Sequence, residues 1–191
     1  LRLEDQRFLT GNGRFTDDEQ RPGQIYAQVV RSDHAHAEVR AIDTVAASAL
    51  PGVIGVWTGA DLIADGLGPM PCSVVAATEG PIFIPPHHAL AVDGVRYVGE
   101  PVVLVVAETA DLAVEAAELV SVDYADLPSL VDPAATGAPD SSPIWPDAPD
   151  NCAFKFSKGD AAAVEAALAA AAHVVELDLD NHRVSAFPME P

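Results

Sequence analysis

The fold of this chain is decided by residues Val95 to Tyr124, which read VRYVGEPVVLVVAETADLAVEAAELVSVDY. Val102 to Ala107 form an unbroken apolar run rich in β-branched residues, a pattern typical of a strand buried on both faces. Thr109 can cap the helix that follows, and a second strand is expected from Val120 to Tyr124. The apolar stripe of this helix comprises Leu112, Ala116, Leu119 and Val120. The segment therefore predicts a β-α-β unit.

Within this unit, the first strand is entered through the tight corner Gly99-Glu100-Pro101. Because the strand is apolar throughout, Val103 and Val105 are expected at the centre of a sheet.

Shorter elements are expected before this unit. Residues 25–31 alternate as a strand, and a short alanine-rich helix starting at Asp43 must end by Leu50, because Pro51-Gly52 follows. Val53 to Trp57 reads as a strand, and a helical turn begins at Thr58-Gly59-Ala60-Asp61. Residues 1–21 are polar, with a turn marked by Gly11 and Gly13.

Two proline-rich stretches interrupt the pattern. Residues 66–94 hold five prolines and predict either a long loop, functional or interfacial, or an extended insertion with edge strands. Residues 128–149 hold six prolines and predict a semi-rigid extended linker. Beyond it, a helix is expected from Asp160 to Ala172 and a strand with one acidic face from His173 to Asp180. Because that strand needs neighbours for its backbone hydrogen bonds, we expect it to dock on the same chain or to drive self-association. The mixture predicts an α+β fold.

Composition excludes several classes of partner. The 191 residues include 29 acidic and 10 basic ones, for a formal net charge of −19. Such a surface repels phosphate backbones and anionic lipid, so neither nucleic-acid nor membrane binding is expected. Five of the ten basic residues fall in the first 31 positions. They form either a cationic arm or a few solvated surface arginines.

Neither a membrane span nor a signal peptide is recognisable, so a cytoplasmic location is expected. Cys72 and Cys152 are far apart and form no CxxC motif, which favours a reduced pair over a bridge. The chain starts at Leu1 without a methionine and reads as a piece of a longer protein.

The histidines and one acid are candidates for chemistry. His34 and His36 lie two residues apart beside Asp33 and Glu38, whereas His87 and His88 are adjacent. No third ligand has a telling spacing, so hydrogen-bonded or surface histidines are favoured over a metal site. Glu100 is either a strained acid in a cleft or a cap for backbone amides at its turn.

Other catalytic signatures are missing. Gly11-Asn12-Gly13 follows no strand and opens no helix, so it reads as a turn rather than a dinucleotide loop. Neither a nucleophile elbow nor a P-loop occurs, and no carboxylates form a compelling pair. We therefore assign no catalytic, cofactor-binding or metal-binding residue.

Four separated segments carry a resemblance to a known family. They read RLEDQRFLTG with GRFTDD (residues 2–11 and 13–18), VRSDHAHA (30–37), RYVGEPV (96–102), and NHR with PMEP (181–183 and 188–191). Together with Pro-Gly-Val and Gly-Ala-Asp-Leu around positions 51–62, they resemble the N-terminal part of the molybdenum-carrying large subunit of the xanthine dehydrogenase, aldehyde oxidase and aerobic carbon monoxide dehydrogenase family. Asp33 stands where that family usually has a proline.

The resemblance implies an α/β-hammerhead with a mixed sheet, followed by the first helix and strand of a molybdopterin-binding domain. The expected divisions are an N-terminal arm (1–20), the hammerhead (21–127), a proline-rich linker (128–150) and the start of the molybdopterin-binding domain, truncated here (151–191). The hammerhead would buttress the cofactor domains and help to form subunit contacts and the substrate channel.

The resemblance also implies an activity for the complete enzyme. Members hydroxylate an aldehyde or N-heterocycle, or oxidise carbon monoxide, at molybdenum on a pterin dithiolene, here of the cytosine dinucleotide type. Electrons leave through two [2Fe–2S] clusters to FAD on a small and a medium partner subunit. The family's pterin-binding segments and catalytic glutamate lie beyond Pro191, so this fragment alone is expected to be inactive and cofactor-free. The alternative is a free-standing, non-catalytic hammerhead module that docks partners.

Overall fold

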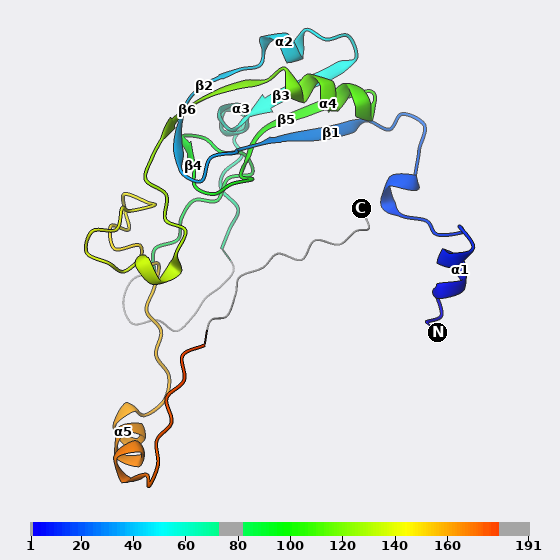
Figure 1. The fold of residues 1–191 in the computed structure, drawn as a ribbon. Coiled ribbons are helices and arrows are strands. Elements are labelled where there is room, and N and C mark those ends of the chain that lie inside the picture. The colour runs from blue at the N-terminus through cyan, green and yellow to red at the C-terminus, as the bar shows by residue number, and fades with distance from the viewer. Residues whose placement is uncertain (1, 73–81, 180–191) are drawn as a thin grey trace. The chain divides into compact units, whose positions relative to one another are not determined.

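The structure, a computed structural model, describes residues 2–72 and 82–179 (Figure 1). The chain divides into two units, of which the larger is Ile25–Ser157. The other comprises the described residues up to Gln24 and those from Lys158 onward. All described strands lie in the larger unit, so this unit contains the sheets that organise the fold.

The first sheet is built around the central apolar strand β5, Pro101–Ala107. Its outer strands are β1 (Tyr26–Arg31) and β3 (Val53–Thr58), and both pair with β5 in antiparallel orientation. In this register Val103 lies opposite Val30 of β1, and Val105 lies opposite Val56 of β3. The predicted central strand is therefore confirmed.

The second sheet has the order β4-β2-β6 and is also antiparallel. Its strands are β4 (Gly94–Val95), β2 (Ala37–Asp43) and β6 (Ser121–Asp126). Sequence analysis located β6 but did not predict β2. In β2 the residues on both faces are partly exposed, and Arg40 and Asp43 interrupt the apolar pattern, so alternation alone does not reveal the strand.

The larger unit also has three short α-helices: α2 (Val45–Ser48), α3 (Gly59–Ala64) and α4 (Ala110–Glu118). Helix α4 contacts β1 and β5 of the first sheet and the neighbouring α2 (Figure 1). Thr109 caps α4 as predicted, because its side chain accepts a hydrogen bond from the amide of Leu112. Ala113 and Ala116 are buried, whereas Leu119, which was predicted to belong to the buried apolar stripe, is 43% exposed.

The core follows from β5. Val102, Val103 and Val105 are fully buried, and since neighbouring residues of a strand point to opposite faces, both faces of β5 are covered. Val95 and Ala37 of the second sheet belong to the same core cluster, as does Ala116 of α4. This packing joins the two sheets and the helix into one unit.

The loop between α3 and β4 returns to the core at Leu90 and Ala91. A Cβ atom on Gly59, the first residue of α3, would lie 2.2 Å from the carbonyl oxygen of Ala91. Only glycine allows the helix to start this close to the returning loop. The contact therefore fixes the position at which the first proline-rich stretch, residues 66–94, returns to the core.

Two predictions about the sheets are wrong. Strands β5 and β6 do not form a β-α-β unit within one sheet, because β5 lies in the first sheet and β6 in the second. The described strands pair only in antiparallel orientation, so the expected mixed sheet is not formed among them. The α+β hammerhead class itself is confirmed. The two sheets share one core through β5 without pairing with each other.

The smaller unit contains helices and irregular segments. Its elements are α1 (Asp5–Leu9), the 3-10 helix η1 (Thr16–Asp18) and α5 (Ala161–Ala170). Helix α5 is capped by Asp160 as expected, and none of its residues is buried. The strand predicted from His173 to Asp180 is not formed over residues 173–179, which are irregular and exposed. None of the described strands pairs with these residues, and unpaired backbone does not stay extended as a strand.

Substituting Val105 tests the central position of β5. Val105→Ala opens a cavity between two covered faces and is expected to lower the free energy of unfolding by about 1–3 kcal/mol. Chemical denaturation of the 191-residue chain measures the change. The matched control is Val114→Ala on α4, where the valine is 45% exposed. An unchanged midpoint for Val105→Ala would show that the strand is not buried.

The start of α3 gives a pH-dependent prediction. Asp61 accepts hydrogen bonds from the amide (2.7 Å) and hydroxyl (2.6 Å) of Thr58, and these bonds lower its pKa from the ordinary 3.8. A carboxylate with a depressed pKa stabilises the fold above its unfolded pKa, and this stabilisation is lost as the pH falls through the folded pKa. Asp61→Asn should therefore cost about 0.5–1 kcal/mol near neutral pH and nothing in strong acid. Urea titrations across pH measure this, with Asp65→Asn at the other end of α3 as control. A cost independent of pH would contradict it.

Candidate functional site

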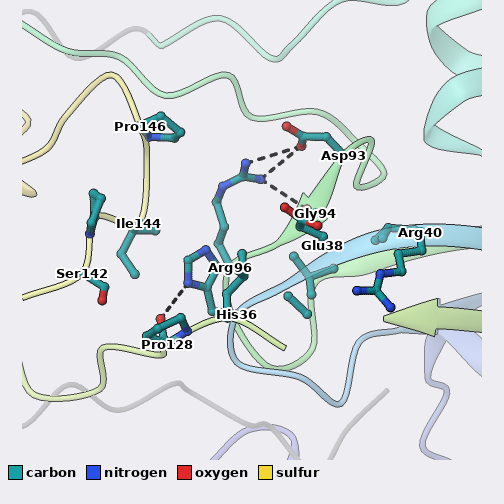
Figure 2. Close-up of a pocket in the computed structure, with 15 residues that line it drawn as sticks. His36, Glu38, Arg40, Asp93, Gly94, Arg96, Pro128, Ser142, Ile144 and Pro146 are labelled. Atoms are coloured by element: carbon teal, nitrogen blue, oxygen red, sulfur yellow. Dashed lines mark hydrogen bonds and ion pairs between the residues drawn. The ribbon is translucent and has the colours of Figure 1, made fainter. Parts of the chain in front are cut away.

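A cavity with a volume of about 560 Å³ lies in the unit Ile25–Ser157. Its walls come from three segments: residues 36–40 of β2 and the loop before it, residues 93–96 around β4, and parts of the proline-containing segment between Leu127 and Pro146 (Figure 2). We call this the β2–β4 cleft. The sequence predicted neither the cleft nor the proximity of these segments.

Arg96 is the principal charged group of the β2–β4 cleft. Its guanidinium pairs with the Asp93 carboxylate at 3.4 Å and donates a hydrogen bond to the Gly94 carbonyl at 3.2 Å (Figure 2). It also stacks on the indole of Trp145, 3.6 Å from the ring centroid. Its side chain is only 16% exposed, and Nε is buried without a hydrogen-bond partner among the described residues. Arg96 therefore ties the proline-containing segment to β4.

The proline-containing segment is a folded loop rather than the extended linker that was predicted. Asn151, in the left-handed region at φ 53°, closes it: its Oδ1 accepts from the amide of Ile144 at 2.8 Å, and its Nδ2 donates to the Ser142 carbonyl at 3.1 Å. A short 3-10 helix, η2 (Pro133–Ala135), lies within the loop. Prolines leave few backbone amides for such closure, so one asparagine side chain supplies the missing bonds.

His36 serves as a structural histidine in the cleft wall. Its ring is buried, and Nδ1 lies 2.8 Å from the carbonyl oxygen of Pro128 (Figure 2). A carbonyl only accepts, so Nδ1 is the donor of this hydrogen bond. The amide of Leu127 donates in turn to the His36 carbonyl. These two bonds hold the chain where it leaves β6.

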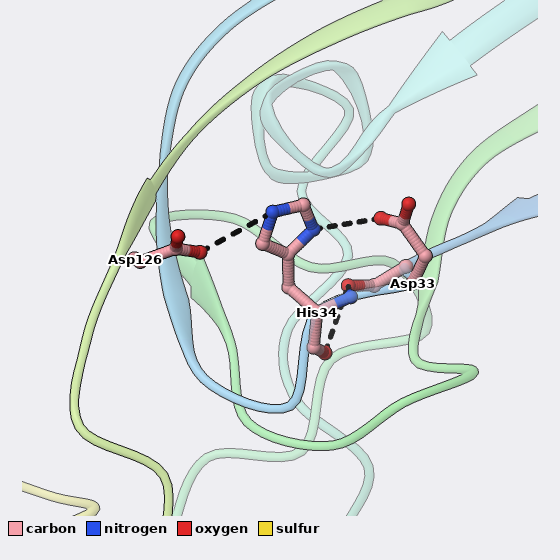
Figure 3. Close-up of polar contacts among 4 residues, drawn as sticks. Asp33, His34 and Asp126 are labelled. Atoms are coloured by element: carbon pink, nitrogen blue, oxygen red, sulfur yellow. Dashed lines mark hydrogen bonds and ion pairs between the residues drawn. The ribbon is translucent and has the colours of Figure 1, made fainter.

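His34 lies between two carboxylates (Figure 3). Its Nδ1 is 2.7 Å from Asp33 Oδ1, and its Nε2 is 3.3 Å from Asp126 Oδ1 at the end of β6. The ring stacks on Tyr124 with centroids 4.4 Å apart. The hydrogen bond to His34 lowers the pKa of Asp33, and burial raises the pKa of Tyr124. The cluster joins the loop before β2 to β6.

The other candidates do not converge into a catalytic or metal site. His87 is exposed, and His88 lines a separate, smaller cavity together with Glu100. Glu38 lines the β2–β4 cleft, but His34 points to a different set of partners from His36. Within residues 2–72 and 82–179, no three His, Cys, Asp or Glu side chains are grouped to hold a metal ion.

Glu100 has the structural role that the turn suggested. Its Oε2 accepts a hydrogen bond from the backbone amide of Arg96 at 2.5 Å, so the carboxylate caps its own turn. This leaves no pair of carboxylates, and no nucleophile with an adjacent base, among the described contacts.

Comparison with known proteins places this fold. Residues 10–128 match the family described as "Aldehyde oxidase and xanthine dehydrogenase, a/b hammerhead domain". The chain is 37% identical to the carbon monoxide dehydrogenase large chain of Afipia carboxidovorans, over 99% of this chain and 24% of that protein. It is 41% identical to the nicotine 6-hydroxylase large subunit of Paenarthrobacter nicotinovorans, over 99% of this chain and 22% of that protein.

Solved structures agree. Reconstituted CO dehydrogenase from Oligotropha carboxidovorans matches with a TM-score of 0.70 and 35% identity, over 91% of this chain and 22% of that chain. Quinoline 2-oxidoreductase from Pseudomonas putida 86 matches with a TM-score of 0.61 and 36% identity, over 74% of this chain and 17% of that chain.

Fold and sequence together define an α/β-hammerhead domain. The chain belongs to the aldehyde oxidase and xanthine dehydrogenase family. It spans about a quarter of the length of the relatives it matches.

The residues of this chain do not supply ligands for the iron–sulfur clusters that the resemblance implies. A [2Fe–2S] cluster is held by four protein ligands, typically four cysteine thiolates, and the chain has only two cysteines. Of these, Cys72 is exposed and Cys152 is partly buried. The β2–β4 cleft is lined by prolines and by two arginines, of which Arg96 is already paired, and its described residues offer no thiolate or imidazole cluster.

A double-mutant cycle tests the tie between Arg96 and Trp145. Arg96→Met and Trp145→Leu should show a coupling of about 1–2 kcal/mol in the free energy of unfolding, because the guanidinium is largely desolvated over the indole. Urea denaturation of the four proteins measures the coupling. Arg40→Met with Trp145→Leu is the matched control, since Arg40 lines the same cleft without stacking on the indole. Equal couplings in the two cycles would contradict the stacking.

Proposed function

We propose that this chain is a portion of the large subunit of a molybdenum hydroxylase, in which residues 25–157 have a structural and interface role. The observation that carries the proposal is the extent of similarity: 99% of the chain aligns with large subunits roughly four times its length. The structure supports a non-catalytic role, because its buried polar groups tie segments together rather than facing a common reaction site.

In the complete enzyme, the rest of the large subunit and the partner subunits would hold the groups that carry out the chemistry. Molybdenum on a molybdopterin, in its cytosine dinucleotide form, would carry out hydroxylation of an aldehyde or N-heterocycle, or oxidation of carbon monoxide. Partner subunits with [2Fe–2S] clusters and FAD would take the electrons. The hammerhead would hold the cofactor domains in place and contribute to the substrate channel. No catalytic residue is assigned in this chain.

A cytoplasmic location belongs to the same proposal. Among residues 2–72 and 82–179, no helix combines the length and apolar character that crossing a bilayer requires. The net charge of −19 also argues against attachment to an anionic membrane surface.

Metal analysis of two proteins tests the proposal. The complete polypeptide encoded by the gene, purified with its partner subunits, should contain molybdenum in proportion to the large subunit, and the 191-residue chain should contain none. Mass spectrometry of metals and fluorescence of the released, oxidised pterin provide the measurements. A complete protein that binds partners but carries neither molybdenum nor pterin would instead support a free-standing docking module.

A further inference from the structure

The turn between β4 and β5 is fixed by many hydrogen bonds. We call residues Arg96 to Glu100 the Tyr97 turn. The amide of Gly99 donates to the Ser32 carbonyl at 2.7 Å, and the amide of Ser32 donates to the Glu100 carbonyl at 2.9 Å. The Arg31 guanidinium donates to the Gly99 carbonyl at 2.9 Å. With the Glu100 carboxylate on the Arg96 amide, the base of the turn is held on both sides.

The backbone of the Tyr97 turn requires glycine at one position. Gly99 has φ +91°, in the left-handed region, where a side chain would be strained. The amide of Glu100 donates to the Tyr97 carbonyl at 3.2 Å and closes the turn. The turn is therefore ordered before any partner binds, so its ordering entropy is not a cost of binding.

The tip of this ordered turn is apolar and exposed. Tyr97 is 46% exposed and Val98 is 64% exposed, whereas Val95 and Val102 on either side are fully buried. Partial burial and the nearby Glu100 raise the pKa of the Tyr97 phenol, so it stays a neutral hydrogen-bond donor. A rigid tyrosine beside an aliphatic side chain is typical of the anchoring residues of protein interfaces.

Physical arguments limit what can cover this tip. Tyr97 and Val98 are exposed and line none of the described cavities, whereas small-molecule sites are concave, so a small molecule is not the expected partner. The net charge of −19 disfavours nucleic acid, anionic membrane and a second copy of the same chain. A different polypeptide surface remains, with an apolar hollow for the two side chains and an acceptor for the phenol hydroxyl.

We propose that the Tyr97 turn is an anchor by which the hammerhead docks onto the remainder of a molybdenum hydroxylase large subunit. This inference rests on the proposed function. The relatives that the chain matches contain more than three quarters of their length outside the matched region, and we assign the covering surface to this part of the same polypeptide.

Site-specific photocrosslinking in the complete polypeptide, purified with its partner subunits, tests the docking. p-Benzoylphenylalanine replaces Tyr97 in one variant and Val98 in a second, so that a folding defect in one does not decide the result. The control carries it at Val114 on α4, where exposure is 45% and matches that of Tyr97. Crosslinked peptides are identified by mass spectrometry, and molybdenum is measured in the same samples.

The expected result is a crosslink from positions 97 and 98 to peptides of the same large subunit outside these 191 residues, at a yield above that of the control. Crosslinks to a second copy or to a partner subunit would overturn the docking, as would yields no higher than those at position 114. Molybdenum present without the crosslink contradicts the docking alone. The crosslink without molybdenum contradicts the proposed function alone.

Discussion

Burial of β5 on both faces is the constraint on which the rest of the structure depends. The seven residues of β5 carry no charge, so exposure of either face to water would be unfavourable. One face is therefore covered by a helix and the other by a second layer. Helix α4 supplies the first cover, and the second sheet contributes Val95 and Ala37 to the same core. The antiparallel partners β1 and β3 then satisfy the backbone of β5 on both edges. The two sheets, their order and the position of α4 all follow from this strand.

Polar side chains attach the irregular segments to that core. Arg96 holds the proline-containing loop through Trp145, Asn151 closes the same loop, and His36 anchors the exit from β6. Each of these groups is used for a structural contact between segments. The exposed tip of the Tyr97 turn differs from them, since its backbone is fixed while its side chains remain uncovered. A fixed backbone with uncovered side chains suits an interface, because little conformational entropy is lost when a partner binds.

The sequence predicted the elements whose signals are local. The apolar run of β5, the Thr109 cap and the Asp160 cap depend on neighbouring residues, and all three are confirmed. Sequence analysis did not predict contacts between residues distant in the chain, nor a strand whose pattern is interrupted by charged residues. Strand β2 carries Arg40 and Asp43, His34 meets Asp126 from far along the chain, and Arg96 meets Trp145 across the second proline-rich stretch. Trp145 among the prolines was the one signal in the sequence that this loop packs against the rest of the unit, because a large aromatic ring is seldom left fully in solvent. The strand expected after α5 failed because an alternating pattern does not provide a pairing partner.

Hydrogen exchange of the 191-residue chain tests most directly whether β5 organises the fold. In native proteins, core amides exchange only through global unfolding, whereas poorly packed segments exchange through local opening. The account predicts that the amides of Val103 and Val105 are the slowest in the chain, with a protection that equals the free energy of unfolding measured by denaturant. Residues 173–179 should exchange with little protection. Slow exchange in residues 173–179 together with fast exchange in β5 would contradict the account.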